Sequence, residues 1–147
     1  ALCSRLNKEK IKFDKILIDA PCSGEGTLRS SPKTFLMWNE KVIQNMSRQQ
    51  KKFFAFAVKC LRKGGTLVYS TCTHAPEENE EVIDFALKNF PLKIESVSIP
   101  LRYREGITKW KDDSYSKELK YACRIYPHDN NSEGFFLAKF TLMEEVQ

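Results

Sequence analysis

The sequence predicts an α/β fold that contains a pair of parallel strands. Two short apolar runs rich in β-branched residues, 13–18 and 65–71, are typical of buried strands. Apolar residues at helical spacing lie between them, which gives the order strand, helix, strand. Each strand leads into a cysteine, and open α/β sheets bind their ligands at the carboxyl ends of their strands. We therefore expect Cys22 and Cys72 to face one pocket.

The size and composition of the chain fit one globular domain. It has 147 residues, of which 41% are hydrophobic, and a formal net charge of +5. This charge suits a phosphate-rich partner, although many proteins without a nucleic-acid role are equally basic. No apolar run approaches the roughly 20 residues of a membrane span, and the amino end lacks the architecture of a signal peptide. These features predict a cytoplasmic protein.

The cysteines and histidines predict neither a disulfide framework nor a metal site. There are five cysteines, an odd number at irregular spacing, and no Cys-x-x-Cys pair occurs. We therefore expect reduced thiols. His74 and His128 have no partners at metal-ligand spacing, so we expect no metal.

A short helix before the first strand and a loop after it are expected in the first part of the chain. Residues 1–12 carry a few apolar side chains among charged ones, which predicts a short helix that leads into this strand. Residues 27–38 contain serines and a proline. They predict a loop that folds over the site.

A helix is predicted from about Arg48 to Arg62. Ser47, with Gln50 three residues on, fits a capping box. Apolar residues then recur at helical spacing: Phe53, Phe54, Ala57, Val58 and Leu61. Gly64 and Gly65 are expected to stop this helix and to turn the chain into the next strand.

A second helix and two further strands are predicted after the second strand. Pro76 suits the first turn of a helix, and the glutamates after it favour the positive end of a helix dipole. Pro91 ends this helix, and residues 92–99 alternate apolar and polar side chains as a half-buried strand does. The last strand is predicted at 134–142. Residues 100–133 are too long for a plain hairpin connection, so we expect them to be functional or poorly ordered.

Three stretches of the chain carry recognisable motifs: DAPCSGEGTLR (19–29), LRKGGTLVYSTCTHAPEENEEV (61–82) and CRIYPHDNNSEGFFLAKF (123–140). Together they resemble the RNA cytosine-5 methyltransferases of the Nol/Nop/Sun type (RsmB-like), in which a Pro-Cys and a Thr-Cys motif occupy successive strand ends. The match runs, with gaps, from about Phe13 to Phe140. Two thiol motifs in order, with the terminal Gly-Phe-Phe, make this resemblance far more specific than a single short pattern.

The resemblance implies that residues 1–147 are a partial methyltransferase catalytic domain. They would form the carboxy-terminal half of a Rossmann-like class I sheet, with parallel strands ending on Asp19 and Cys72 and then an antiparallel pair. The family's glycine-containing cofactor motif has no counterpart before Asp14, so the chain is expected to lack the amino-terminal half that binds S-adenosylmethionine. That half would lie in the same chain or in another. An exposed apolar edge is then expected at 16–18, and such an edge invites pairing with another chain.

The resemblance also implies methylation of cytosine C5 in tRNA or rRNA with S-adenosylmethionine as the cofactor. C5 is a poor nucleophile until a thiolate adds to C6 and breaks the aromaticity of the ring, so this reaction needs an activated cysteine. By resemblance Cys72 is the nucleophile and Cys22 assists release of the product. Asp19 contacts the target base or the methionine part of the cofactor, and Pro21 is expected at the cofactor as well.

Other interpretations of the thiols stay open. Cysteine is among the most buried residue types, so packing is the alternative role for Cys22 and Cys72, and it is the expected role of Cys3, Cys60 and Cys123. DNA cytosine methyltransferases also use a Pro-Cys, so this motif alone does not choose between RNA and DNA. A non-catalytic RNA-binding module that keeps this half-fold is a further alternative.

Cations that alternate with aromatic residues predict an RNA-binding surface. Arg29 and Lys33, in the loop after the first strand, are placed to reach phosphates. A second group combines cations with aromatic rings that can stack on bases: Arg102, Tyr103, Arg104, Lys109, Trp110, Lys111 and Tyr115. The alternative is a solvated connecting loop whose aromatic residues cover the sheet edge.

Overall fold

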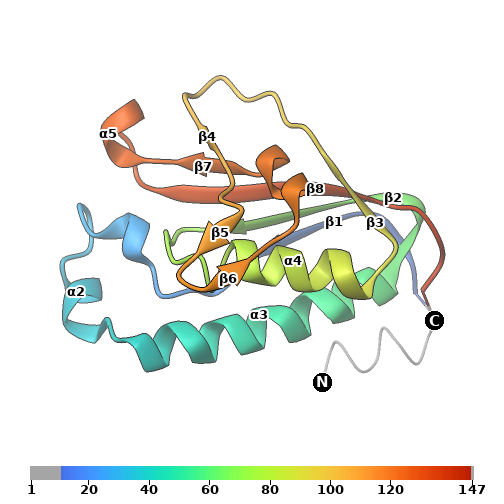
Figure 1. The fold of residues 1–147 in the computed structure, drawn as a ribbon, viewed down its shortest axis with the longest axis horizontal. Coiled ribbons are helices and arrows are strands. Elements are labelled where there is room, and N and C mark those ends of the chain that lie inside the picture. Colours follow the sequence, from blue (N-terminus) through green and yellow to red (C-terminus); the bar gives the residue numbers. More distant parts are fainter. Residues whose placement is uncertain (1–10, 147) are drawn as a thin grey trace.

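The computed structural model describes residues 11–146, which form a mixed sheet with two long helices against it (Figure 1). In chain order the elements are β1 (Phe13–Asp19), η1 (Glu25–Thr27), α2 (Lys33–Met37), α3 (Glu40–Cys60), β2 (Leu61–Thr71), α4 (Glu80–Asn89), β3 (Leu92–Glu95), β4 (Arg104–Glu105), β5 (Lys109–Trp110), β6 (Asp113–Ser114), η2 (Lys117–Tyr121), β7 (Cys123–Ile125), α5 (Pro127–Asn130) and β8 (Phe135–Leu142). The helix predicted over residues 1–12 falls largely outside the described residues.

The parallel strand pair predicted from the sequence is present. β1 and β2 run parallel, with Ile18 beside Tyr69 and Asp19 beside Ser70. Both strands therefore end at the same edge of the sheet. Because α3 lies between them in the chain, the three elements form a strand–helix–strand crossover, which parallel strands require.

β8 joins the parallel pair to an antiparallel half of the sheet. It runs antiparallel to β2, β3 and β7, and the short β4 pairs with β7. The predicted antiparallel pairing of the last strand with the strand after residue 91 is confirmed, although β3 covers only four residues instead of 92–99. The register places Phe136 beside Thr71, so β8 begins next to the second thiol segment.

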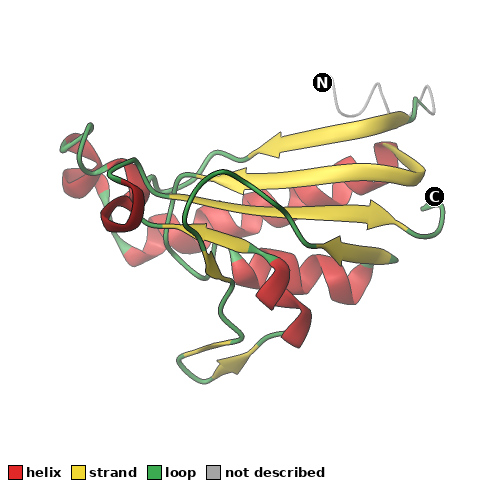
Figure 2. Ribbon diagram, turned by 90° about the horizontal axis from the view of Figure 1, so that it is seen from above, coloured by secondary structure: helices red, strands yellow, loops and turns green. Residues whose placement is uncertain are grey.

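One face of the sheet packs against α3 and α4, as the two views in Figures 1 and 2 show. Side chains alternate between this buried face and the opposite face along β8 and along the second part of β2. Aromatic rings fill the centre of the core. The Phe54 centroid lies 5.7 Å from that of Tyr69 and 5.4 Å from that of Phe140. Within residues 11–146, no helix has the length and apolar character needed to cross a membrane.

α3 begins earlier than the sequence predicted. Its first residue is Glu40, because Asn39 caps it: Asn39 Oδ1 accepts a hydrogen bond from the Val42 backbone nitrogen at 3.0 Å. The predicted capping pair, Ser47 and Gln50, instead lies inside the helix with both side chains buried. The prediction was wrong because a capping pair and a buried polar pair share the same sequence spacing.

The predicted stop at Gly64 and Gly65 was also wrong. α3 ends at Cys60, and β2 begins immediately with Leu61. Gly64 has a φ of 75°, a left-handed conformation that favours glycine, and the pairing of β2 with β1 shifts its register over this part of the strand. The glycines thus bend the start of a strand instead of ending a helix.

Two other segments differ from the prediction. α4 starts at Glu80, and Pro76 lies in a turn before it, where its carbonyl oxygen accepts a hydrogen bond from the Asn79 backbone nitrogen. Residues 100–133, predicted to be functional or poorly ordered, are folded and contain the short strands β4–β7 with η2 and α5. Residues 27–38 include α2 in place of a plain loop.

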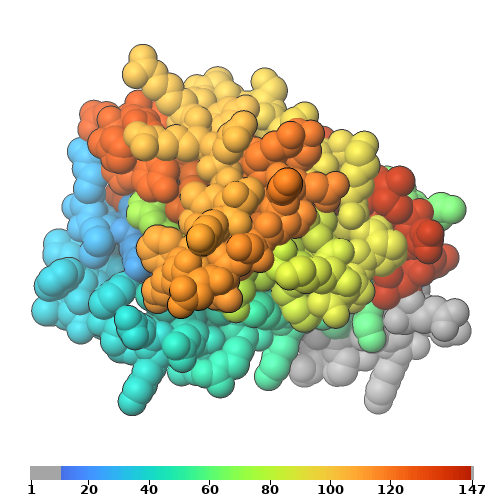
Figure 3. Space-filling view, in the orientation of Figure 1, coloured from blue at the N-terminus to red at the C-terminus, as the bar shows by residue number. Residues whose placement is uncertain are grey.

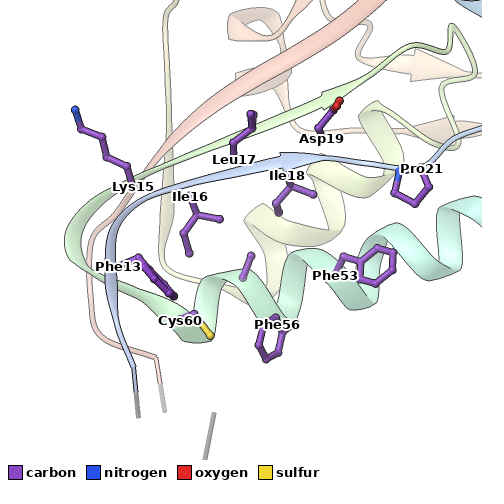
Figure 4. A pocket seen from close by; sticks show the side chains of 11 residues that line it. Phe13, Lys15, Ile16, Leu17, Ile18, Asp19, Pro21, Phe53, Phe56 and Cys60 are labelled. Carbon is purple, nitrogen blue, oxygen red and sulfur yellow. The ribbon is translucent and has the colours of Figure 1, made fainter. Parts of the chain in front are cut away.

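β1 has the exposed edge that the sequence predicted. Among the described residues it pairs only with β2, and Leu17 is 67% exposed. Figure 4 shows Leu17 and Asp19 on one side of β1 and Ile18 on the side that faces α3. A groove of about 500 Å³ lies here and is lined by Phe13, Lys15, Ile16, Leu17, Ile18, Asp19, Pro21, Phe53, Phe56, Ala57 and Cys60.

A buried ion pair joins α4 to β7. The Arg124 guanidinium donates to both carboxylate oxygens of Glu80 at 2.6 Å, and both side chains are almost fully buried. Arg124 also donates to the His74 carbonyl oxygen, and Glu80 Oε1 accepts from the Ile107 backbone nitrogen. The pair therefore holds the segment after β2 and the segment after β4 against α4.

Replacing Arg124 by Met should lower the free energy of unfolding by about 3–5 kcal/mol, because it leaves the Glu80 carboxylate buried without its cation. Arg62→Met is the matched control. It removes an exposed ion pair with Asp14 and should cost about 1 kcal/mol or less. Urea unfolding followed by circular dichroism measures both losses. Equal losses in the two variants would contradict a special role for the buried pair.

Candidate active site

The cysteines that follow β1 and β2 meet at the carboxyl edge of the parallel pair. Cys22 Sγ and Cys72 Sγ lie 3.2 Å apart, within hydrogen-bond range for sulfur. Both side chains are partly exposed, so small molecules in solvent have access to them. The fold thus brings two thiols from separate loops into direct contact.

Backbone contacts hold the two thiol segments together. The Gly26 nitrogen donates to the Cys72 carbonyl oxygen at 2.8 Å, and the Gly134 nitrogen donates to the Gly26 carbonyl oxygen at 2.9 Å. A Cβ atom on Gly26 would collide with the Gly134 carbonyl oxygen and would lie 2.8 Å from the Cys72 carbonyl oxygen. Only glycine at this position permits such a close approach of three backbone segments.

A buried polar pair fixes the backbone on both sides of Cys22. Gln50 Nε2 donates to the Pro21 carbonyl oxygen at 2.9 Å and to Glu78 Oε2 at 2.8 Å. The same Glu78 oxygen accepts from the Ser23 backbone nitrogen at 3.0 Å. Gln50 and Glu78 are both 0% exposed, so water does not compete for these bonds. Burial raises the pKa of the Glu78 carboxyl.

A second set of hydrogen bonds fixes the backbone around Cys72. Asn79 Oδ1 accepts from Thr71 Oγ1 at 2.6 Å, and Asn79 Nδ2 donates to the Thr73 carbonyl oxygen at 3.0 Å. Glu25 Oε2 accepts from Thr73 Oγ1 and from the His74 backbone nitrogen, both at 3.2 Å. Asn79 therefore bridges the residues before and after the thiol.

Cys72 is the more acidic of the two thiols. The hydrogen bond from Cys22 lowers the pKa of Cys72 to about 7, against the opposing effects of burial and of the Asp19 and Glu78 charges. The same bond raises the pKa of Cys22, because the Cys22 proton is held by the Cys72 sulfur. Near neutral pH a large share of Cys72 is therefore thiolate, the nucleophilic form, while Cys22 keeps its proton.

Comparison with known families identifies the kind of protein to which these thiols belong. A family model described as 16S rRNA methyltransferase RsmB/F matches residues 3–141. The chain belongs to this family. The resemblance to Nol/Nop/Sun-type, RsmB-like methyltransferases found in the sequence is thereby confirmed.

Curated relatives match most of this RsmB/F family member. It is 44% identical over 127 residues to the tRNA (cytosine(49)-C(5))-methyltransferase of Pyrococcus abyssi, a match that covers 86% of this chain and 41% of that protein. It is 37% identical over 132 residues to the 28S rRNA (cytosine-C(5))-methyltransferase of Mus musculus, which covers 87% of this chain and 16% of that protein. The chain therefore spans less than half the length of these relatives.

Solved structures share the fold. The methyltransferase homolog protein from Pyrococcus horikoshii has a TM-score of 0.81 and 34% sequence identity, over 94% of this chain and 42% of that one. NSun6 from Pyrococcus horikoshii, solved with SFG, has a TM-score of 0.76 and 36% identity, over 97% of this chain and 33% of that one. The predicted fold class is confirmed, since the chain corresponds to part of a methyltransferase fold.

In this RsmB/F family member, Asp19 and Pro21 lie at the end of β1. Asp19 Oδ1 accepts a hydrogen bond from Ser70 Oγ at 3.0 Å, and the Asp19 side chain is exposed. The Asp19 charge acts on Cys72, whose pKa it raises. Pro21 lines the groove beside β1, as Figure 4 shows. Both residues therefore lie near the thiols and along the exposed edge.

Part of the predicted RNA-binding group gathers around α5. Arg29 donates to Asn131 Oδ1 at 3.0 Å, and Arg104 pairs with Asp129 at 2.9 Å. The Arg104 hydrogen bond to Asp129 raises the pKa of Arg104, so this guanidinium stays charged. Arg102 is exposed on the same segment. These cations are solvent-accessible, although Arg29 and Arg104 also bind other side chains of the same chain.

The other predicted RNA-binding residues lie elsewhere. Lys109 and Trp110 are on β5, and Trp110 Nε1 donates to Glu77 Oε1 at 3.0 Å, ahead of α4. Lys33 is the exposed first residue of α2. The structure thus divides the predicted basic and aromatic surface between α5, the β5–β6 hairpin and α2, and it does not gather these residues at one place.

Three polar residues of the site were not predicted from the sequence: Gln50, Glu78 and Glu25. For Gln50 a signal existed, because it is a polar residue at a core position of an amphipathic helix. The contacts of Glu78 and Glu25 join distant segments, so no local pattern could reveal these two residues.

The histidines lie outside any metal cluster in the described part of the chain. Among residues 11–146 no three His, Cys, Asp or Glu side chains are arranged to hold a metal ion. His74 stacks on Tyr126 with ring centroids 5.0 Å apart, and burial lowers its pKa. His128 Nε2 lies 3.0 Å from the Arg104 guanidinium.

Removal of the Cys22 thiol should raise the pKa of Cys72 toward the ordinary value of about 8.5, because the hydrogen bond that stabilises the thiolate is lost. At pH 7 the thiolate fraction of Cys72, and with it the rate of alkylation by iodoacetamide, should fall roughly tenfold in Cys22→Ala. Peptide mass spectrometry of alkylated Cys72 across pH measures this pKa.

Cys123→Ala, which changes a buried thiol on β7, is the matched control for this experiment. Its alkylation profile for Cys72 should keep a midpoint of about pH 7. A profile that is the same in Cys22→Ala and in the unsubstituted chain would show that the Cys22 thiol does not set the acidity of Cys72.

Proposed function

We propose that this chain is the thiol-bearing part of an enzyme that methylates C5 of cytosine in tRNA or rRNA with S-adenosylmethionine. The observation that carries the proposal is the 3.2 Å contact between the Cys22 and Cys72 sulfur atoms at the ends of adjacent parallel strands. Relatives named as tRNA and rRNA cytosine-C5 methyltransferases support the substrate class. They favour RNA over the DNA substrate that the Pro-Cys motif alone left open.

In this mechanism Cys72 attacks C6 of the cytosine as a thiolate. Its pKa of about 7 supplies that form at neutral pH. As the S–C6 bond forms, the π electrons of the C5–C6 double bond move to C5. C5 then takes the methyl group, and the electrons of the broken methyl–sulfur bond stay on the donor sulfur. A base then removes the proton from C5. The double bond forms again as the S–C6 bond breaks.

Cys22 assists the last step by stabilising the departing sulfur. The raised pKa of Cys22 keeps this thiol protonated, and its sulfur lies 3.2 Å from that of Cys72. When the S–C6 bond breaks, Cys72 leaves as a thiolate that again accepts the hydrogen bond from Cys22. The contact that makes Cys72 a nucleophile therefore also makes it a better leaving group.

Asp19 and Pro21 fit one part of the cofactor. S-adenosylmethionine supplies an electrophilic methyl group from a cationic sulfur, and its methionine part carries a charged amino group. Asp19 offers an exposed carboxylate at the end of β1, whose charge already acts on Cys72. A carboxylate attracts such positive groups. Pro21 adds an apolar surface along the same edge.

The remainder of the cofactor site lies, in this proposal, on a further half-domain in the same or another chain. This chain corresponds to 41% of the Pyrococcus abyssi relative. The exposed edge of β1, with Leu17 and the neighbouring groove, is a surface that an added strand would cover. Residues 1–147 are then the carboxy-terminal part of a catalytic domain.

A non-catalytic RNA-binding role is the alternative from a different class. It would use the exposed cations and aromatic residues, but it gives no reason for two thiols in contact or for a lowered Cys72 pKa. In the proposed enzyme the RNA backbone is held by Arg29, Lys33, Arg102, Arg104 and Lys109, and Trp110 stacks on a base. A cytoplasmic location stays a prediction from the sequence.

The assigned roles predict different products for two substitutions in the longer natural protein. Cys72→Ser should abolish turnover and leave no covalent protein–RNA species, because a hydroxyl is far less ionised than a thiol at neutral pH. Cys22→Ser should also stop turnover, because the shorter C–O bond of serine draws the hydrogen-bond donor away from the Cys72 sulfur. It should still allow addition and methyl transfer, so a protein–RNA adduct accumulates. Denaturing gel electrophoresis with labelled substrate RNA detects the adduct.

Cys123→Ala serves as the control, since it changes a buried thiol outside the site and should retain turnover without an accumulated adduct. An adduct in Cys72→Ser and none in Cys22→Ser would reverse the two roles. Intact turnover in both variants, without an adduct, would refute the catalytic proposal. Packing would then be the role of both cysteines.

A further inference from the structure

A second cavity, outside the thiol pair, lies where the loops after β1 and β2 meet the start of α3 and the β5–β6 hairpin. Its volume is about 420 Å³, within the usual range for small-ligand sites and ample for one planar base. In Figure 3 the light-green residues after β2 are visible between the blue surface and the orange hairpin. The lining residues are Glu25, Trp38, Glu40, Ile43, Gln44, His74, Ala75, Pro76, Glu77, Trp110 and Lys111.

Two tryptophans line this cavity, and a carboxylate anchors each of them. Trp38 Nε1 donates to Glu25 Oε1 at 2.6 Å, and Trp110 Nε1 donates to Glu77 Oε1 at 3.0 Å. The rings are nevertheless 47% and 38% exposed. A large aromatic ring that is accessible and held in place is a good stacking surface for a nucleobase.

The charges around the cavity favour a base over a phosphate. Among the described residues that line it, three are glutamates and one is a lysine, and Lys111 Nζ lies 3.4 Å from Glu77 Oε1. Carboxylates repel phosphates but accept hydrogen bonds from the amino groups of bases. Both contacts of Glu77 with described side chains use Oε1, so Oε2 can accept from a ligand.

The cavity shares Glu25 with the hydrogen bonds that hold the thiol site. Glu25, which anchors Trp38, also accepts hydrogen bonds from Thr73 Oγ1 and from the His74 backbone nitrogen. Thr73 directly follows Cys72. A base in the cavity would therefore be a close neighbour, along the RNA, of a cytosine that reaches the thiols.

We propose that this cavity binds an unpaired nucleobase of the RNA close to the target cytosine, with guanine preferred. Guanine presents the N1–H and N2–H groups side by side, and Glu77 Oε2 and the Glu40 carboxylate of the lining can accept from them. Uracil has a single ring N–H between two carbonyl oxygens, which carboxylates repel. The proposal rests on the proposed function for its RNA substrate, and it adds a site that selects the sequence next to the target.

Trp38 and Trp110 are the only two tryptophans of the chain, so their fluorescence reports on this cavity alone. The 147-residue chain is titrated with three short single-stranded oligouridine RNAs, which carry guanosine, uridine or an abasic residue at one central position. The guanosine RNA should quench both tryptophans and bind roughly tenfold more tightly than the abasic RNA, and the uridine RNA should lie between them.

Each tryptophan can be replaced while the fluorescence of the other reports binding. Trp38→Ala should weaken binding of the guanosine RNA roughly tenfold, measured through Trp110, and Trp110→Ala should do the same, measured through Trp38. Glu77→Gln should reduce the preference for guanosine over uridine. Tyr121→Ala, which removes an exposed aromatic residue outside the cavity, is the control and should change neither value.

Equal binding of the guanosine and abasic RNAs would overturn the proposal, and so would unchanged affinity in both tryptophan variants. The result of the RNA titration can be distinguished from the result of the adduct experiment that tests the proposed function. A failed titration together with adduct formation by Cys22→Ser in the longer protein would refute the base site alone. Guanosine-dependent quenching without any adduct would support the base site and count against the methyltransferase mechanism.

Discussion

The parallel register of β1 against β2 is the constraint on which the rest of the site depends. Because Asp19 lies beside Ser70, the two strands end level, and the loops that carry Cys22 and Cys72 start side by side. A slip by one residue would turn every β1 side chain to the other face of the sheet, which would expose Ile18 and bury Leu17. The core contacts of α3 thus fix the register, and the register brings the thiols together.

Buried polar side chains then convert adjacent loops into a defined site. Gln50 and Glu78 hold the backbone beside Cys22, while Asn79 bridges the residues on both sides of Cys72. Gln50 lies on α3, and Glu78 and Asn79 lie just before α4. The packing of these two helices therefore fixes the positions of the thiols. Because these hydrogen bonds are shielded from water, they hold the two loops firmly. The two sulfur atoms therefore stay close enough to share one hydrogen bond.

Sequence patterns predicted the parallel pair, the last strand and the meeting of the two thiols, because apolar periodicity and strand-end motifs are local signals. They did not predict the start of α3, since Asn39 caps the helix while Ser47 and Gln50 have the spacing of a cap without that role. Nor could they show that Arg29 and Arg104 gather at α5 while Trp110 lies against Glu77. Those positions depend on how residues 100–133 fold back on distant segments.

The Gly26 junction holds the Cys22 and Cys72 thiols in contact, and the proposed chemistry depends on this contact. Mild oxidation of the 147-residue chain with diamide, followed by peptide mass spectrometry, probes the contact, because a disulfide needs the sulfur atoms to approach by only about 1 Å more. We expect a Cys22–Cys72 link to form first, and to form much more slowly in Gly26→Ala than in Gly64→Ala, which strains the backbone at a φ of 75° but places no atom against the thiol segments. A first link through Cys60 or Cys123, or equal rates in the two glycine variants, would show that the junction does not hold the thiols together.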